Sequence, residues 1–162
     1  MKKRILILLI LFTVIITGCG YEEPEVKVEK LTDKATRVSV DFNDQKLPES
    51  TKLAVTEVAT DYSGLSSEIQ KSIAYDISLK ADSDVKLKDE VTVYLNIPVD
   101  FNRRFLAVYL VDNNKIKKKY EVQISKDVLT FSTKELGIFV LAEVTEEQIK
   151  RTEVPKINSE EE

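Results

Sequence analysis

The chain has 162 residues, with 24 basic and 28 acidic side chains, one cysteine, and neither histidine nor tryptophan. Without histidine, the usual base of serine and cysteine hydrolases and the commonest zinc ligand are missing. The four glycines are scattered, which excludes a glycine-rich phosphate loop. A hydrolase built on two carboxylates stays open as a remote alternative because acids are plentiful, but no pair stands out. We expect a protein that is not an enzyme and has no cofactor.

The first 18 residues have the pattern of an export signal. Three basic residues at positions 2–4 precede an apolar run over 5–17, shorter than the about 20 residues of a membrane-spanning helix. The run ends in Ile16, Thr17, Gly18 and Cys19, which resembles the lipobox of bacterial lipoproteins. The resemblance implies that a signal peptidase recognises the residues at 16–18 and that the thiol of Cys19 carries a diacylglyceryl group.

Lipidation of Cys19 would place the protein on the outer face of the cell membrane. Two acyl chains anchor a protein stably, whereas one chain is marginal. Once Cys19 is modified no thiol remains, so disulfides are excluded. Removing the signal removes three basic residues and no acid, which leaves a net charge near −7. An acidic domain argues against nucleic-acid binding, and the membrane contact is expected through the lipid alone.

Beyond the signal we predict three regions. Residues 19–34 are charged and poor in branched apolar residues, as in a flexible tether. Residues 35–144 form the folded domain. Residues 145–162 carry many acids and end in Glu160, Glu161 and Glu162, which predicts a mostly disordered tail with at most one helical turn.

Alternation of apolar and polar residues predicts about seven or eight strands in the central region. Residues 105–111 are apolar on both faces, which is typical of a central strand. Asn113 and Asn114 predict a tight turn, and Tyr120, Val122 and Ile124 a single return strand. The interval 64–71 breaks the pattern and predicts a short helical connection. The other predicted strands centre on 38–42, 53–55, 73–79, 91–97, 129–131 and 138–142.

Several phrases between Ala74 and Glu143 occur in a recognisable order, and the segment resembles the Ig-like β-sandwich repeats of Gram-positive surface proteins. The resemblance implies an all-β, Ig-like antiparallel sandwich and a role as an adhesive or spacer module. Such repeats often carry histidine before the last strand, where this chain has Glu135, Leu136 and Gly137. The phrases are residues 74–79, 91–93, 97–98, 106–112, 129–133 and 137–142.

Three groups of residues are candidates for binding. Asp82 and Asp84, with Asp89 nearby, resemble a fragment of a calcium loop, but the glycine and the distal glutamate of an EF-hand are missing, which favours a polar loop between strands. Lysines at 115, 117, 118 and 119 could contact a phosphate-bearing wall polymer or acidic headgroups, or could only protect an exposed strand. Tyrosines at 75, 94, 109 and 120 could form a binding face, or could pack in the sheets.

The sequence therefore predicts a monomeric, lipid-anchored module of the bacterial cell envelope. Its expected role is binding, adhesion or spacing, with an envelope protein or a wall polymer as the partner. The alternative is a lipoprotein that binds a small envelope molecule or Ca²⁺ at the loop that contains Asp82.

Overall fold

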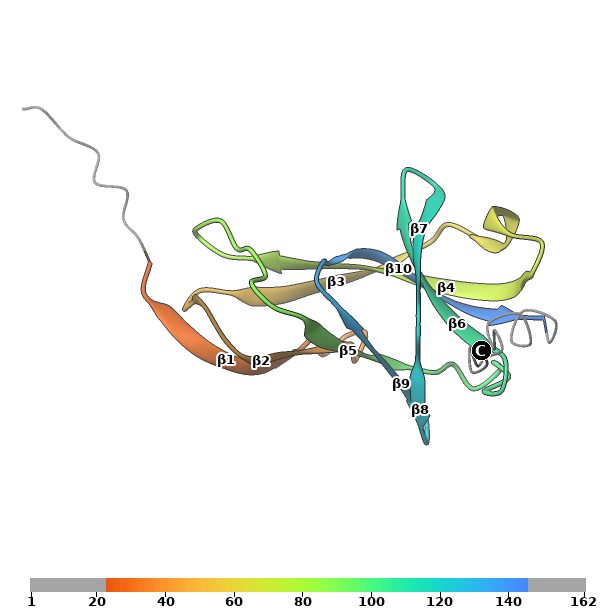
Figure 1. The fold of residues 1–162 in the computed structure, drawn as a ribbon, viewed down its shortest axis with the longest axis horizontal. Coiled ribbons are helices and arrows are strands. Elements are labelled where there is room, and N and C mark those ends of the chain that lie inside the picture. The colour runs from red at the N-terminus through yellow and green to blue at the C-terminus, as the bar shows by residue number, and fades with distance from the viewer. Residues whose placement is uncertain (1–22, 146–162) are drawn as a thin grey trace, which may run out of the picture.

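The computed structural model describes residues 23–145, and it confirms the predicted all-β sandwich. Two five-stranded sheets pack face to face, and every strand pair is antiparallel (Figure 1). The described part contains ten strands, where the sequence predicts seven or eight. The residues predicted to be signal, lipidation site and tail lie outside the described residues, apart from Thr145.

The first sheet has the strand order β1-β2-β5-β9-β8 and the second has the order β3-β4-β10-β6-β7. The strands of the first sheet are β1 (Glu25–Thr32), β2 (Ser39–Pro48), β5 (Val91–Asn96), β9 (Val128–Thr133) and β8 (Gln123–Ser125). Those of the second are β3 (Lys52–Val58), β4 (Ile69–Lys80), β10 (Gly137–Val144), β6 (Leu106–Asp112) and β7 (Lys115–Tyr120).

The main core lies between the sheets and follows from the period of two along each strand. Val91, Val93 and Leu95 of β5 are fully buried, while the residues between them face outward and are half-buried. At the centre three aromatic rings meet. The ring centroids of Phe131 and Phe139 are 5.0 Å apart, and Tyr120 lies 5.0 Å from the first and 5.8 Å from the second.

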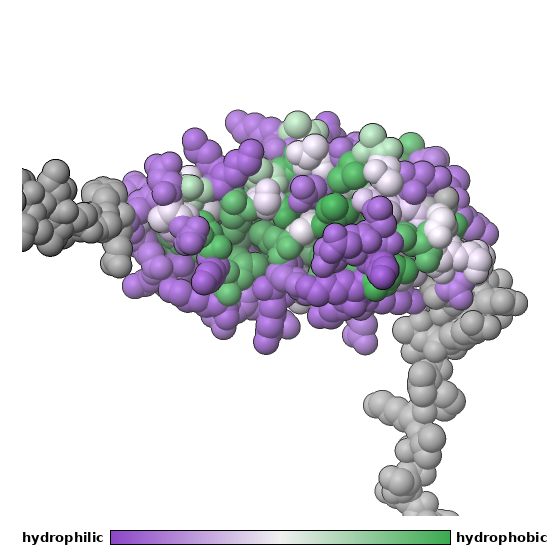
Figure 2. All heavy atoms as spheres, turned by 90° about the horizontal axis from the view of Figure 1, so that it is seen from above, coloured by the Kyte–Doolittle hydropathy of each residue, from purple (hydrophilic) through white to green (hydrophobic). Residues whose placement is uncertain are grey.

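A second, smaller core covers the outer face of the second sheet. Strand β6 is buried on both faces, as predicted, because its alternate residues enter different cores. Tyr109 and Val111 point outward with Val140 of β10, and Tyr62 from the β3–β4 connection packs with them. Figure 2 shows apolar residues between hydrophilic ones over the side of the molecule that carries this connection.

The tether predicted for residues 19–34 is wrong over Glu25–Thr32, which form β1 and pair with β2 in antiparallel register. β1 is an edge strand and most of its residues are exposed. An exposed edge strand needs few apolar side chains. The charged composition of β1 therefore resembles that of a flexible linker. A regular helix is also absent from the described part of the 64–71 interval. A 3₁₀ turn, η1, spans Ser63–Leu65, and β4 begins at Ile69.

The loop between β4 and β5 is fastened by one buried side chain, Gln45 of β2. Its amide oxygen accepts hydrogen bonds from the backbone N–H groups of Lys88 and Asp89, at 3.0 and 3.1 Å. Its amide nitrogen donates to the carbonyl oxygens of Asp89 and Glu90, at 3.2 and 3.4 Å. Gln45 thus supplies donors and acceptors to backbone groups that no strand pairs.

The two ends of the described chain lie at opposite ends of the long axis (Figure 1). β1 begins at one end, where the β4–β5 loop also lies. β10 ends at the other, near the loop between β5 and β6. A chain held at its N-terminal side would thus have its C-terminal side farthest from the point of attachment.

Candidate functional site

The three predicted ion-binding acids do not come together. Asp82, Asp84 and Asp89 all lie in the β4–β5 loop with exposed side chains. Over residues 23–145, no three or more acidic, cysteine or histidine side chains form a group that could hold a metal ion. The loop is held through its backbone and not through these carboxylates. The N–H of Asp82 donates to the hydroxyl of Ser50 at 3.0 Å, and the backbone N–H and carbonyl groups of Asp89 bond to the side chain of Gln45.

Asp84 instead lines an open cleft of about 680 Å³ beside the start of β1. Acidic and basic side chains occur there in equal number, and Lys88 lies 3.4 Å from Glu25. The cleft has no net formal charge and so offers no preference for either sign of ligand. Its charged residues are Glu23, Glu25, Asp84, Lys46, Lys86 and Lys88.

The predicted tyrosine face does not form, because the four tyrosines have separate environments. Tyr75 and Tyr120 belong to the core between the sheets, and Tyr109 belongs to the outer cluster. Burial raises the pKa of Tyr109 to about 12, and the nearby charge of Glu68 adds to the shift. Only Tyr94 is partly exposed, and the ammonium group of Lys30 lies 3.7 Å from its ring centroid. The packing interpretation of these residues is therefore the correct one.

The predicted lysines lie on β7, which is the edge strand of the second sheet. The predicted tight turn is confirmed: Asn113 and Asn114 both have positive φ, 48° and 57°, as a two-residue hairpin of type I′ requires. Lys117 forms an ion pair of 2.5 Å with Glu135, and this hydrogen bond raises the pKa of Lys117. Lys118 lies 4.6 Å from the ring centroid of Tyr120.

The strand that was predicted to run through Tyr120, Val122 and Ile124 is two strands. β7 ends at Tyr120 in the second sheet, and β8 begins at Gln123 in the first. The chain therefore changes sheets within two residues. An alternating pattern can continue across such a change, so periodicity alone does not reveal it.

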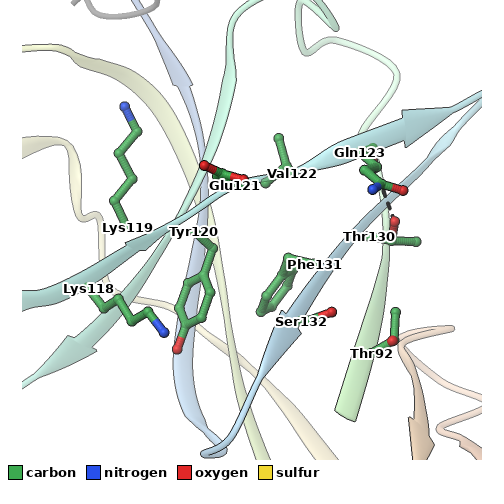
Figure 3. A pocket seen from close by; sticks show the side chains of 10 residues that line it. All are labelled: Thr92, Lys118, Lys119, Tyr120, Glu121, Val122, Gln123, Thr130, Phe131 and Ser132. Carbon is green, nitrogen blue, oxygen red and sulfur yellow. Dashed lines mark hydrogen bonds between the residues drawn. The ribbon is translucent and has the colours of Figure 1, made fainter. Parts of the chain in front are cut away.

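This crossing creates a cleft that the sequence does not indicate. β8 is only three residues long and pairs with β9 over Val128–Thr130. Beyond Thr130 the edge of β9 has no β8 partner, and the crossing segment lies beside it (Figure 3). The resulting notch has a volume of about 530 Å³. We call it the β7–β9 notch; its lining is Thr92, Lys118, Lys119, Tyr120, Glu121, Val122, Gln123, Thr130, Phe131 and Ser132.

Two buried rings stand at the bottom of the β7–β9 notch, and polar groups surround them. Tyr120 and Phe131 are 6% and 3% exposed. The phenol of Tyr120 lies 2.9 Å from the hydroxyl of Thr133, and that hydroxyl donates to the carbonyl oxygen of Glu135 at 2.8 Å. A threonine hydroxyl has one proton, so Tyr120 is the donor to Thr133. This bond ties the end of β7 to the end of β9.

The sheet register places the polar side chains of the notch next to one another. Thr92 of β5 is directly opposite Ser132 of β9, and Gln123 of β8 is directly opposite Thr130 of β9. Side chains two residues apart on a strand share a face. All four therefore lie on the outer face of the first sheet, on the other side of Phe131 from Lys119 in Figure 3.

No family model, curated protein or solved structure matches this chain. Among the described residues, no helix is long and apolar enough to cross a membrane.

Proposed function

We propose that the protein is a non-enzymatic, lipid-anchored β-sandwich of the bacterial cell envelope that acts as a binding, adhesion or spacer module. The observation that carries the proposal is the order of two features along the chain. A basic and apolar leader ends in Ile16, Thr17, Gly18 and Cys19, and a sandwich strand begins at Glu25. A lipid at Cys19 would act directly on a folded domain.

The early start of β1 changes what the anchor would do. Six residues extend at most about 20 Å, whereas the 16-residue tether predicted from the sequence would reach about 55 Å. Since β1 begins at one end of the long axis, the anchor would hold that end close to the bilayer. The β5–β6 loop and the end of β10 would then be farthest from the membrane.

The form of the sandwich supports binding more than passive spacing. A spacer needs only a stable, soluble surface. This domain also has a cleft of about 530 Å³ at a point where the chain changes sheets, and its polar side chains project from three strands of the first sheet. The calcium alternative has less support, because Asp82, Asp84 and Asp89 are exposed and do not gather.

The anchor is tested by metabolic labelling of the full-length protein with a fatty acid in a bacterial host, followed by membrane fractionation. Cys19→Ala should abolish labelling and leave the signal uncleaved, because the thiol that takes the lipid is gone. Thr17→Ala is the matched control, since it keeps a small residue at this position and should label normally. Continued labelling of the Cys19→Ala protein would contradict the proposal.

Binding and spacing are separated by a photo-crosslinking residue placed in the lipid-anchored protein in intact cells. At Ser132, inside the β7–β9 notch, a binding module should give a discrete crosslinked product. At Asp84, in the cleft beside β1 whose charges balance, it should give none. A purely passive spacer would give the same result at both positions.

A further inference from the structure

The geometry points to the β7–β9 notch as a docking site for an extended peptide segment of a partner protein, which adds as a short strand to the open edge of β9. The inference deepens the binding role proposed above and rests on it for the presence of a partner in the envelope. Pairing itself is a property of the notch and is measured on purified protein. A negative result would therefore leave the lipid anchor untouched.

The backbone of β9 bonds to its two neighbours through alternate residues. The N–H of Ile97, which follows β5, donates to the carbonyl oxygen of Asp127 at 2.9 Å, and the register continues this pairing along β5 and β9. In an antiparallel ladder every second residue bonds to the same neighbour, so the odd-numbered residues of β9 bond to β5. The even-numbered residues, Val128, Thr130 and Ser132, point their N–H and carbonyl groups to the opposite side.

Ser132 is the even-numbered residue without a partner strand. Val128 and Thr130 lie opposite Ser125 and Gln123 of β8, but β8 does not extend as far as Ser132. Among residues 23–145, no backbone group bonds to the N–H or the carbonyl oxygen of Ser132. The residue is exposed and lines the notch. Both of its backbone groups are therefore available to one residue of an incoming strand, which is the pairing used in β-strand addition.

The notch has room beside Ser132 because the chain leaves the sheet there. From Gln123 and Thr130 the crossing segment and β9 diverge, and the rings of Tyr120 and Phe131 stand between them (Figure 3). The space has a volume of about 530 Å³. An added strand would continue the line of β8 beyond Gln123, so the first sheet already defines its position and direction.

The open edge of β9 also lacks the charges that protect other edges of the sandwich. The edge strands β1, β3 and β7 each carry acidic or basic side chains, and charges on an edge strand discourage pairing with another chain. Between Thr130 and Thr133, β9 has no charged residue. The charged residues that line the notch come from β7 and the crossing segment, and not from β9. Charge therefore does not protect this edge from pairing.

The register predicts which side chains such a peptide carries. A residue opposite Ser132 would point to the outer face of the first sheet, beside the hydroxyls of Ser132 and Thr92. Its two neighbours would lie opposite Phe131 and Thr133, whose side chains are buried. Those neighbours would point toward the aromatic cluster, because successive side chains of a strand alternate between faces. A polar residue between two apolar residues therefore fits this edge best.

The test is an NMR titration of the isotope-labelled full-length protein in uncharged detergent micelles. The probe is a synthetic peptide in which threonine and valine alternate between two terminal lysines. Binding should shift the signal of the Ser132 amide proton downfield and slow its exchange with solvent, because this N–H gains a hydrogen bond. The signals of β1, β3 and β7 should stay unchanged.

Two methylated forms of the probe test the direction of pairing. N-methylation of the threonines removes the donors that would face β9, and it should weaken binding at least about tenfold. N-methylation of the valines changes the opposite edge of the peptide, and it should alter the affinity less than about threefold. The two forms have the same composition and number of methyl groups per pair of residues, so each is the control for the other.

Variants of the protein locate the site. Ser132→Pro removes an N–H that the ladder with β5 does not use, so the fold should remain while probe binding falls at least about tenfold. Ser132→Ala keeps the backbone and should change the affinity less than about twofold. Lys27→Pro is the matched control and should bind the probe normally. The bond from the N–H of Glu49 to the carbonyl oxygen of Pro24 shows that Lys27 also points its N–H away from its only partner strand.

Equal weakening by the two methylated probes, normal binding to the Ser132→Pro protein, or no binding of the probe would overturn strand addition at β9. Self-association that shifts the Ser132 signal without any probe would make a second copy of the chain the occupant and would overturn the partner protein. If the Ser132→Pro protein does not fold, the two methylated probes still decide the question on the unchanged protein.

Discussion

The hydrogen bond between Tyr120 and Thr133 allows a quantitative test of how the β7–β9 notch is built. The phenol donates to the threonine hydroxyl, which donates in turn to the carbonyl oxygen of Glu135 and accepts from the N–H of Glu135 at 3.2 Å. Both side chains are buried, at 6% and 1% exposure. Tyr120→Phe removes one bond and keeps the ring in its aromatic cluster. Thr133→Val removes the hydroxyl at the centre of all three.

The two substitutions should have unequal costs. After Tyr120→Phe the Thr133 hydroxyl keeps its partners at Glu135, so the loss is that of one ordinary hydrogen bond, about 1 kcal/mol. After Thr133→Val the buried phenol has lost its acceptor, and an unsatisfied buried group costs about 1–3 kcal/mol in addition to the lost bonds. We expect a decrease of about 2–3 kcal/mol in the free energy of unfolding.

The double variant decides whether this network exists. Without the phenol, Thr133→Val no longer leaves an unsatisfied donor, so the combined cost should be smaller than the sum by about 1 kcal/mol. Urea unfolding followed by circular dichroism measures all three free energies. Tyr94→Phe is the control, because Tyr94 is partly exposed and contacts the ammonium group of Lys30 through its ring. Costs that add within about 0.3 kcal/mol would refute the network.

Two further predictions concern other buried polar groups. Gln45→Glu replaces the amide that donates to Asp89 and Glu90 with a carboxylate that repels their carbonyl oxygens. It should lower the free energy of unfolding in urea by about 2–3 kcal/mol, and Gln45→Met should lower it by less. The reverse order would contradict the hydrogen bonds assigned to the Gln45 amide. The pKa of Tyr109 is about 12 in the folded protein, against 10.0 ordinarily. Unfolded chains lose this proton first as pH rises, so stability should fall between about pH 10 and 12. Tyr109→Phe should flatten that fall in unfolding measured across this range; an unchanged slope would argue against the shift.

Prediction from the sequence was accurate where a strand has one buried and one solvated face. The alternation in Val91–Asn96 and in Ile73–Leu79 follows from the fact that successive side chains point to opposite faces. The Asn113-Asn114 turn was equally readable, since few residues other than asparagine and glycine tolerate two consecutive positive φ angles. Both the alternation and the asparagine pair depend only on residues that are neighbours in the sequence.

Strand β1 was missed because its environment differs from that of an interior strand. Six of its eight residues are exposed, so burial imposed little pattern on them. It is held mainly by the backbone ladder to β2, from Glu25 opposite Pro48 to Thr32 opposite Ser39, and only Val28 and Leu31 pack against the core. Backbone hydrogen bonds are available to almost any sequence. An edge strand of this kind is therefore close to a charged linker in composition, and only its partner distinguishes the two.

The β7–β9 notch was missed for a related reason, and the reason explains why it is there. A chain that passes from one sheet to the other must leave its partner in the first before it reaches a partner in the second. Between Tyr120 and Gln123 it has neither, and the adjacent edge of β9 beyond Thr130 is left unpaired by β8. A cleft lined by polar groups follows from that interruption. The opposite wall of the notch includes Thr92 of β5. Thr92 is far from β9 in the sequence and comes next to Ser132 only when β5 and β9 pair in the sheet. The residues of the notch were visible in the sequence, but which of them share a face is a property of the fold: Lys119 pairs with Tyr109 of the outer cluster, whereas Thr92 pairs with Ser132 on the outer face of the first sheet.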